Sequence, residues 1–443
     1  MNQTLRMIGI SIAVFISSLD TAIVNTAIQP ISNSLSISVD QAIWFVIIYH
    51  LALLSTMFFL GNLGEKKGYS KMMEIGILLF VVSSLFCGLS STFIQLLISR
   101  FIQGLGASAI LVSNVVLIKK SANPNNLGRL IGINAMVIAA GFSLGPSIAS
   151  LLLRFSTWPL LFYINIPLGI ISLALLYKNL PVDQLKNNFN WKGNLFVAVL
   201  FLMFFLSIDF IYHQKFLFFA IAALCTSIIG IIVITLKQKK SNYDLLPIDI
   251  LKNKFVRFSL TGTMVLFFNQ SVGYVLFPLV LVQLFEVNIT SVGFFISPWP
   301  LIATLVAPIS GYISDKYSPT KISSYGLFFM TIGFLIISTF SYEIPIYTFG
   351  LMMMICGLGF GLFQSPNIKN IMSIVPIERN GVASSLLGFT RVFGQVIGSM
   401  FVSIFIRNYS INNWRYAVYF SVFLGFIGSI TLFRSHILSK QIY

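Results

Sequence analysis

Asp20 is the residue in this sequence with the clearest chemical potential, because it lies inside a long apolar segment that runs from about Met7 to Ile28. An acid at the centre of a hydrocarbon-length helix costs about 2.5–3.5 kcal/mol on insertion scales. Such a carboxylate usually faces a polar cavity, where it can bind and release a proton or attract an organic cation. The alternative is a structural acid that accepts hydrogen bonds from Asn25 or from a neighbouring helix.

Arg100 is a second charge within an apolar segment, near residues 95–118. A guanidinium keeps its proton, so it can only stabilise an anion or bind carbonyl groups. One role for Arg100 is to modulate the proton affinity of an acid such as Asp20. The alternative is a fixed network with Gln103 that bridges two helices.

Two further titratable residues occur in apolar segments. Asp209 lies near the end of the segment 193–212, where it is a candidate proton carrier or a solvated residue at a helix end. His50 lies within the segment 42–60 and titrates near neutral pH. A lone histidine of this kind is more often a hydrogen-bonding residue of the packing.

Polar residues in the second half of the chain are candidates for lining a cavity or for bridging helices. Arg391 and Gln395 are four positions apart, so they share one face of a helix. The remaining candidates in this region are Asn269, Gln270 and Gln364.

The composition is that of a polytopic membrane protein. Of the 443 residues, 57% are hydrophobic and only 9% are charged, with a mean hydropathy of +0.90, whereas a soluble domain carries about 25% charge. The cysteines Cys87, Cys225 and Cys356 show neither metal-ligand spacing nor a disulfide framework. No nucleophile elbow or phosphate-binding loop is present. These patterns argue against an enzyme, and we expect no metal and no cofactor.

Segments long enough to cross a bilayer recur along the whole chain. A hydrocarbon core of about 30 Å needs about 20 helical residues at 1.5 Å each. By this measure we expect fourteen spans, near 7–28, 42–60, 72–92, 95–118, 128–152, 158–177, 193–212, 215–236, 258–284, 290–310, 321–340, 345–366, 381–405 and 414–434.

Basic residues are distributed asymmetrically about these spans. With a cytoplasmic N-terminus, only four of the 28 Lys and Arg residues fall on outer segments, namely Arg154, Lys215, Arg407 and Arg415. Two more lie within spans, and the others lie on cytoplasmic segments. This bias follows the positive-inside rule and predicts that both termini are cytoplasmic. It also accounts for the net charge of +16 without a nucleic-acid partner.

A weak internal repeat divides the chain into two halves. The stretches that begin at Gly61 and Gly311 each carry an acid at the fifth position, Glu65 or Asp315, followed by Lys. Parallel repeats of this kind are typical of transporters. We therefore expect an N-terminal six-helix half, an inserted helix pair with its cytoplasmic lead-in, a cytoplasmic linker and a C-terminal six-helix half, at 1–180, 181–240, 241–257 and 258–443.

Several motifs, in order and on the expected spans, resemble the major facilitator superfamily and within it the fourteen-span drug:proton antiporters. They are Leu19–Pro30 on the first span, Gly61–Lys71 after the second, Arg100–Ala107 on the fourth, Gly132 to Pro146 on the fifth, and Trp158 to Gly169 at the sixth. The fifth-span motif departs from the family pattern, which has two glycines where this chain has Ala149 and Ser150.

The resemblance implies an all-α fold of two six-helix halves plus two inserted helices, with spans 1, 4, 9 and 12 around a central cavity. The expected proton-coupling residues are Asp20, Arg100, Asp209 and His50. The expected substrate cavity contains Asp20, Asn25, Gln103, Asn269, Gln270, Gln364, Arg391 and Gln395.

Other motif residues are expected to serve conformational change. We expect Glu65 and Asp315 to latch the two halves together near helix ends; the alternative is that they only terminate helices. Closely spaced glycines allow tight helix contact, and a proline bends a helix. The residues concerned are Gly61, Gly68, Gly132, Gly141, Gly145 and Pro146.

The sequence and the resemblance together predict a proton-coupled antiporter of the bacterial cytoplasmic membrane. It would export lipophilic, cationic or zwitterionic drugs by alternating access. Its expected partners are these small molecules, protons and the lipid bilayer, and we expect a monomer. The alternatives are a dedicated exporter of an endogenous metabolite, lipid or peptide and, more remotely, a membrane-embedded enzyme or signalling subunit.

Overall fold

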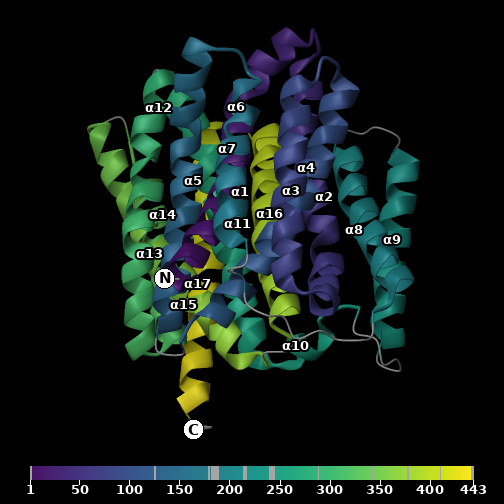
Figure 1. The fold of residues 1–443 in the computed structure, drawn as a ribbon. Helices are drawn as coiled ribbons and strands as arrows, with labels where there is room; N and C mark the ends of the chain where they lie inside the picture. Colours follow the sequence, from purple (N-terminus) through teal and green to yellow (C-terminus); the bar gives the residue numbers. More distant parts are fainter. Residues whose placement is uncertain are drawn as a thin grey trace. The chain divides into compact units, whose positions relative to one another are not determined.

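The computed structural model describes residues 2–123, 126–177, 180, 189–212, 217–238, 245–287, 289–341, 343–376, 379–409 and 411–440. Every regular element among these residues is a helix (Figure 1). The expected all-α class is therefore confirmed for the part of the chain that the structure describes.

Among the described residues up to Gln238 there are nine helices. They are α1 (Asn2–Ser34), α2 (Val39–Lys67), α3 (Tyr69–Leu89), α4 (Phe93–Ser121), α5 (Leu127–Phe155), α6 (Leu160–Tyr163), α7 (Asn165–Leu176), α8 (Trp191–Tyr212) and α9 (Leu217–Gln238).

The second part begins with a short helix and continues with long ones. Its elements are α10 (Ile248–Lys252), α11 (Lys254–Gln283), α12 (Ile289–Ile296), α13 (Pro298–Lys316), α14 (Pro319–Ser338), α15 (Tyr347–Ile374), α16 (Asn380–Tyr409), the 3-10 helix η3 (Ile411–Asn413) and α17 (Trp414–Lys440).

Local sequence signals set several helix boundaries. Ser38 and Gln41 form a reciprocal capping box at the start of α2. Gly68 separates α2 from α3 with φ of 93°, a left-handed conformation that glycine adopts without steric cost. Pro319 begins α14 at a position where its missing N–H leaves no hydrogen bond unmade.

Thirteen helices among the described residues are long and apolar enough to cross a membrane. The sixth expected span differs from the others, because Leu160–Leu176 is shorter and is divided at Ile164 into α6 and α7. Pro167 accounts for the division, since its ring clashes with the carbonyl group of Tyr163 in a continuous helix.

The chain groups into two compact units. Unit 1 consists of residues 1–121, 144–250 and 375–389, and unit 2 consists of residues 122–143, 251–374 and 390–443. Residues of α5 and α16 therefore belong to both groups, whereas the expected halves were contiguous in sequence. Helices α8 and α9, which we expected to be an inserted pair, belong to unit 1, where they run side by side and α8 packs on α2 (Figure 1).

Glycines allow the closest helix contacts within each unit. In unit 1, a Cβ atom at Gly106 of α4 would lie 2.8 Å from the carbonyl oxygen of Gly76 on α3. In unit 2, a Cβ at Gly359 of α15 would lie 2.6 Å from the carbonyl oxygen of Gly326 on α14. Small residues drive helix association in lipid by close van der Waals packing. The two units thus use the same device on helices that the sequence repeat relates.

Candidate functional site

Asp20 lies at the centre of a polar network in unit 1. The residue is fully buried on α1. One carboxylate oxygen, Oδ2, accepts a hydrogen bond from Nη1 of Arg100 at 2.6 Å. The other, Oδ1, accepts from Nε2 of Gln103 and Nδ2 of Asn165, each at 3.0 Å. Three donors from α4 and α7 therefore hold both oxygens of a carboxylate within apolar helices.

Arg100 is held as fully as its partner. It is 1% exposed, its Nε donates to the carbonyl oxygen of Phe45 at 3.1 Å, and its Nη1 also donates to Oε1 of Gln103. The guanidinium lies over the rings of Tyr49 and Phe162, at 4.4 and 5.7 Å from their centroids. Cation–π contacts of this kind gain strength when the cation is removed from water.

The network extends to α3 through a serine hydroxyl. Oγ of Ser84 accepts from Nε2 of Gln103 at 2.8 Å and from Nδ2 of Asn165 at 3.4 Å. Asn165 is the first residue of α7, directly after the division at Ile164, so the division places its amide beside Asp20. Asn165 lies within the sixth-span motif, but we did not predict it as a site residue. The sequence signal for it is a polar residue that precedes Ile-Pro within an apolar segment. Ser84 had no comparable signal.

A proton and the Arg100 guanidinium compete for the negative charge of the Asp20 carboxylate. Protonation would remove the anion and leave the buried guanidinium without its ionic partner. Because an uncompensated buried charge is strongly unfavourable, a proton arriving at Asp20 would favour rearrangement of α1 against α4.

Of the other unit 1 candidates, His50 packs edge-on against Tyr49, with ring centroids 5.4 Å apart. Nδ1 of His50 donates to the carbonyl oxygen of Val46 on its own helix at 2.9 Å. Asn25 is exposed on α1, and the described partners of Asp20 do not include it. Asp209 belongs to α8, but its side chain lies outside the described residues. Their expected roles stay predictions.

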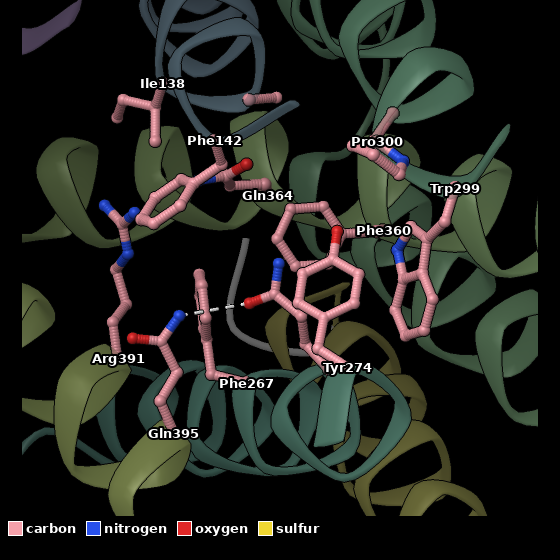
Figure 2. Close-up of a pocket in the computed structure, with 13 residues that line it drawn as sticks. Ile138, Phe142, Phe267, Tyr274, Trp299, Pro300, Phe360, Gln364, Arg391 and Gln395 are labelled. Carbon is pink, nitrogen blue, oxygen red and sulfur yellow. Dashed lines mark hydrogen bonds between the residues drawn. The ribbon is translucent and has the colours of Figure 1, made fainter. Parts of the chain in front are cut away.

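Unit 2 contains a small hollow between five helices. Most of its lining is aromatic or aliphatic, and a few amide and guanidinium groups converge on it (Figure 2). The lining residues are Ile138, Ala139 and Phe142 of α5; Phe267, Gln270 and Tyr274 of α11; Trp299, Pro300 and Ala303 of α13; Phe360 and Gln364 of α15; and Arg391 and Gln395 of α16.

Four of the predicted cavity residues meet at this hollow: Gln270, Gln364, Arg391 and Gln395. Nε2 of Gln395 donates to Oε1 of Gln270 at 3.2 Å, as Figure 2 shows. Asn269 is not among the lining residues; it is fully buried and donates to the carbonyl oxygen of Ser421 at 3.2 Å. The aromatic lining was missed, because an aromatic residue on a span usually faces lipid and gives no separate signal.

Asp315 joins the start of α5 to α13 and α15 within unit 2. Its carboxylate accepts from the backbone nitrogens of Gly128 and Arg129 at 2.8 and 3.0 Å. Nζ of Lys369 donates to the same carboxylate at 2.6 Å. Since α5 begins at Leu127, the acid lies at the positive end of the helix dipole.

Glu65 makes a looser contact in unit 1. One of its oxygens lies 3.6 Å from Nη1 of Arg379. Arg379 also donates to Asp249 of α10, from Nε at 2.9 Å and from Nη2 at 2.8 Å. Partial burial raises the pKa of Asp249, but the hydrogen bond and charge of Arg379 outweigh it and hold the pKa below its ordinary value. Arg379 and Asp249 are 130 residues apart in sequence, so no local pattern predicts their pairing.

The motif glycines lie at close contacts. A Cβ at Gly61 would meet Oγ of Ser385 in unit 1. At Gly132 it would lie 2.7 Å from the carbonyl oxygen of Ala307 in unit 2. Gly145 faces Ala22 in the same way within unit 1. Gly141 is buried in α5, and the side chain of Pro146 lies outside the described residues.

Comparison with known proteins decides the family. Residues 10–251 and 259–439 match the Major Facilitator Superfamily. The chain belongs to this superfamily. It is therefore a transporter and not an enzyme, and the expected absence of catalytic chemistry agrees with the family.

Relatives of this major facilitator transporter occur in several bacteria. It is 31% identical over 427 residues to the uncharacterized transporter YebQ of Escherichia coli, covering 96% of this chain and 92% of that one. It is 30% identical over 422 residues to the riboflavin transporter RibZ of Clostridioides difficile, covering 94% and 91%. Multidrug resistance protein 3 of Bacillus subtilis is 25% identical over 402 residues, covering 88% and 77%.

Solved structures show the same fold. The proton:xylose symporter XylE aligns with a TM-score of 0.70 at 16% identity, covering 98% of this chain and 95% of that one. The human organic anion transporter MFSD10 aligns with a TM-score of 0.69 at 11% identity, covering 97% and 98%. The facilitator fold thus holds two distinct polar regions, the Asp20 network of unit 1 and the hollow of unit 2.

Proposed function

We propose that the chain is a proton-coupled antiporter that exports small lipophilic organic molecules across a bacterial cytoplasmic membrane. The observation that carries the proposal is the ion pair between Asp20 and Arg100 at 2.6 Å, both fully buried in apolar helices. The 25% identity to multidrug resistance protein 3 of Bacillus subtilis supports drug-like substrates.

The topology we propose has fourteen spans, with α6 and α7 together forming the sixth, and both termini in the cytoplasm. The distribution of basic residues supports this topology. The proposed halves, 1–180 and 258–443, flank the inserted pair at 181–240 and the linker at 241–257. The matching glycine contacts of α3 with α4 and of α14 with α15 support the repeat.

In the proposed mechanism, a proton from outside binds Asp20 and releases Arg100, which favours one orientation of the transporter. Substrate binding favours the orientation in which the proton leaves. Each charge that crosses the membrane contributes about 2.3 kcal/mol per 100 mV. His50 and Asp209 are the candidates for carrying a second proton.

Glu65 and Asp315 are the proposed latches of one conformational state. Asp315 is the stronger of the two, because it accepts from a helix N-terminus and from Lys369 at 2.6 Å. Loss of either latch would shift the balance between orientations without touching the substrate contacts.

A second candidate function is dedicated export of one metabolite, and a specific observation favours it. The chain is 30% identical to the riboflavin transporter RibZ over 94% of its length. The hollow of unit 2 combines aromatic rings with amide groups, a lining suited to a flat heteroaromatic compound. Riboflavin itself is therefore a candidate substrate.

Everted membrane vesicles test the proposed function. We expect ATP-driven acidification to energise uptake of at least one compound among ethidium, norfloxacin and riboflavin, and an uncoupler to abolish it. Asp20→Asn should remove the dependence on the pH gradient, whereas Glu74→Gln, a matched change of an acid on α3 outside the network, should keep it. Uptake that is indifferent to the gradient would refute proton coupling. A response to riboflavin alone would favour the second candidate.

A further inference from the structure

The hollow of unit 2 has a marked excess of hydrogen-bond donors. Arg391 brings a guanidinium with five N–H groups and no acceptor, and the indole of Trp299 is also a donor only. Each side-chain amide of Gln270, Gln364 and Gln395 has one NH2 group that donates and one carbonyl oxygen that accepts. No lining residue has a carboxylate. A ligand that satisfies this lining must be rich in acceptors.

Arg391 lies over an aromatic ring and makes no hydrogen bond or ion pair with another described residue. Its guanidinium carbon is 4.9 Å from the centroid of Phe267. Arg100, by contrast, has three polar partners, the carboxylate of Asp20, the carbonyl oxygen of Phe45 and the amide of Gln103. In Figure 2 the guanidinium of Arg391 lies beside the ring of Phe142, at one end of the group of lining side chains.

Trp299 provides an independent observation at the other end of this group. The side chain is fully buried, and its Nε1 has no hydrogen-bond partner among the described residues. A buried donor without a partner costs about 1–3 kcal/mol in general. A ligand that offers an acceptor to Nε1 of Trp299 would remove this cost. Figure 2 shows the indole edge that carries the nitrogen turned toward Tyr274 and Phe360.

Aromatic faces lie between these two donor groups. Phe267, Tyr274 and Phe360 line the hollow, and the rings of Tyr274 and Trp299 lie 5.1 Å apart. Flat aromatic surfaces favour offset or edge contacts with a ligand ring.

We propose that this hollow binds an aromatic organic anion, with its carboxylate or other oxyanion at Arg391 and its ring among Phe267, Tyr274 and Phe360. A carbonyl or second oxygen of the ligand accepts from Nε1 of Trp299. The inference rests on the proposed function in one respect, that the hollow is a substrate site. It departs from the expected cationic drugs, because a positive ligand would meet a guanidinium and no balancing acid in the lining.

Equilibrium binding to the purified full-length protein in lipid nanodiscs tests the inference. The probes are 2-naphthoate, the neutral 2-naphthamide and the cationic 2-naphthylmethylammonium, which share one ring system and differ in charge. We expect calorimetric titration to give at least 10-fold tighter binding of 2-naphthoate than of the cation. Arg391→Gln should weaken 2-naphthoate binding at least 10-fold and remove the preference for the anion over the cation. Arg391→Lys keeps the positive charge and should still bind the anion more tightly than the cation.

Two controls make the test specific. Arg154→Gln changes another arginine whose guanidinium lies over a phenylalanine ring, Phe155 at 5.9 Å, outside the hollow, and it should leave all three affinities unchanged. Trp299→Phe keeps the aromatic surface and removes the donor, so it should weaken 2-naphthoate binding about 3- to 10-fold. Equal or tighter binding of the cation, no binding of 2-naphthoate, or an unchanged preference in Arg391→Gln would overturn the inference.

The binding test separates this inference from the proposed function, because it needs no gradient. A preference for the anion together with gradient-independent vesicle uptake would refute proton coupling and leave the binding site standing. Gradient-driven uptake together with a preference for the cation would support proton coupling and refute the proposed anion site.

Discussion

Arg100 in unit 1 and Arg391 in unit 2 are both arginines on apolar helices, yet their surroundings differ. Arg100 is 1% exposed and pairs with Asp20 at 2.6 Å, and a carbonyl, an amide and two aromatic faces complete its contacts. Arg391 has the face of Phe267 and borders a hollow without a lining acid. The first arrangement neutralises a charge internally, and the second leaves a charge for a ligand.

The acids that we propose as latches show a smaller difference of the same kind. Asp315 in unit 2 accepts from two backbone nitrogens and from Lys369. Glu65 in unit 1 is 3.6 Å from Arg379, which gives its two short hydrogen bonds to Asp249. We therefore expect substitutions at Asp20 and Asp315, which have short ion pairs of 2.6 Å, to have larger effects than those at Arg391 and Glu65.

The largest expected effect is that of Asp20→Asn. It leaves Arg100 buried without an anion, and breaking a buried ion pair costs about 3–5 kcal/mol. The measurement is the free energy of unfolding by denaturant in detergent micelles. Arg391→Gln should change the same quantity by less than about 1 kcal/mol, because no ion pair is lost.

A double variant distinguishes the ion pair from general damage to the core. Asp20→Asn combined with Arg100→Gln removes both charges and should recover a large part of the lost stability. Equal destabilisation by Asp20→Asn and Arg391→Gln would show that the two arginines do not differ as we describe.

A smaller effect is expected for Asp315→Asn. It removes the charge at the start of α5 and the ion pair with Lys369, while an amide oxygen can still accept, so we expect a loss of about 1–2 kcal/mol. Glu65→Gln should cost less than Asp315→Asn, because the ion pair of Glu65 with Arg379 is 3.6 Å long and that of Asp315 with Lys369 is 2.6 Å long. The same unfolding assay ranks the two, and a larger loss for Glu65→Gln would reverse our assignment of the stronger latch.

The smallest effect concerns Asp249, whose side chain is 44% exposed. Although partial burial opposes it, the hydrogen bond and charge of Arg379 lower its pKa from the usual 3.8. A lowered pKa stabilises the folded state at pH values above the pKa that the group has in the unfolded state. This stabilisation is lost as the pH falls through the pKa of the folded state. Asp249→Asn should therefore cost less than about 1 kcal/mol, constant between pH 5.5 and 8. A difference that changes across that range would contradict the assignment.

Much of the fold followed from patterns that the sequence states directly. Apolar segments of span length predicted the helices, and the repeated stretches at Gly61 and Gly311 pointed to related helix ends. The division of the sixth segment was not predicted, although Pro167 is its physical cause. The predicted boundaries of the two halves stay a prediction.

The site was only partly predictable for reasons of geometry. Charged and amide residues in apolar segments are rare enough to stand out, which singled out Asp20, Arg100 and the four polar residues of the hollow. Trp299 and Phe360 did not stand out, because aromatic residues are abundant on every segment. Asn165 and Arg379 act through partners more than 100 residues away, and such pairings leave no periodic trace.

The most direct test of the account is proton release when ligand is added to the purified protein in weakly buffered detergent solution. With 2-naphthoate as the ligand, we expect wild type to release protons, Asp20→Asn to bind ligand without release, and Arg391→Gln to release only at higher ligand concentration. Asp209→Asn tests the second candidate carrier. Proton release by Asp20→Asn equal to that of wild type would contradict the division of roles between the two arginine sites.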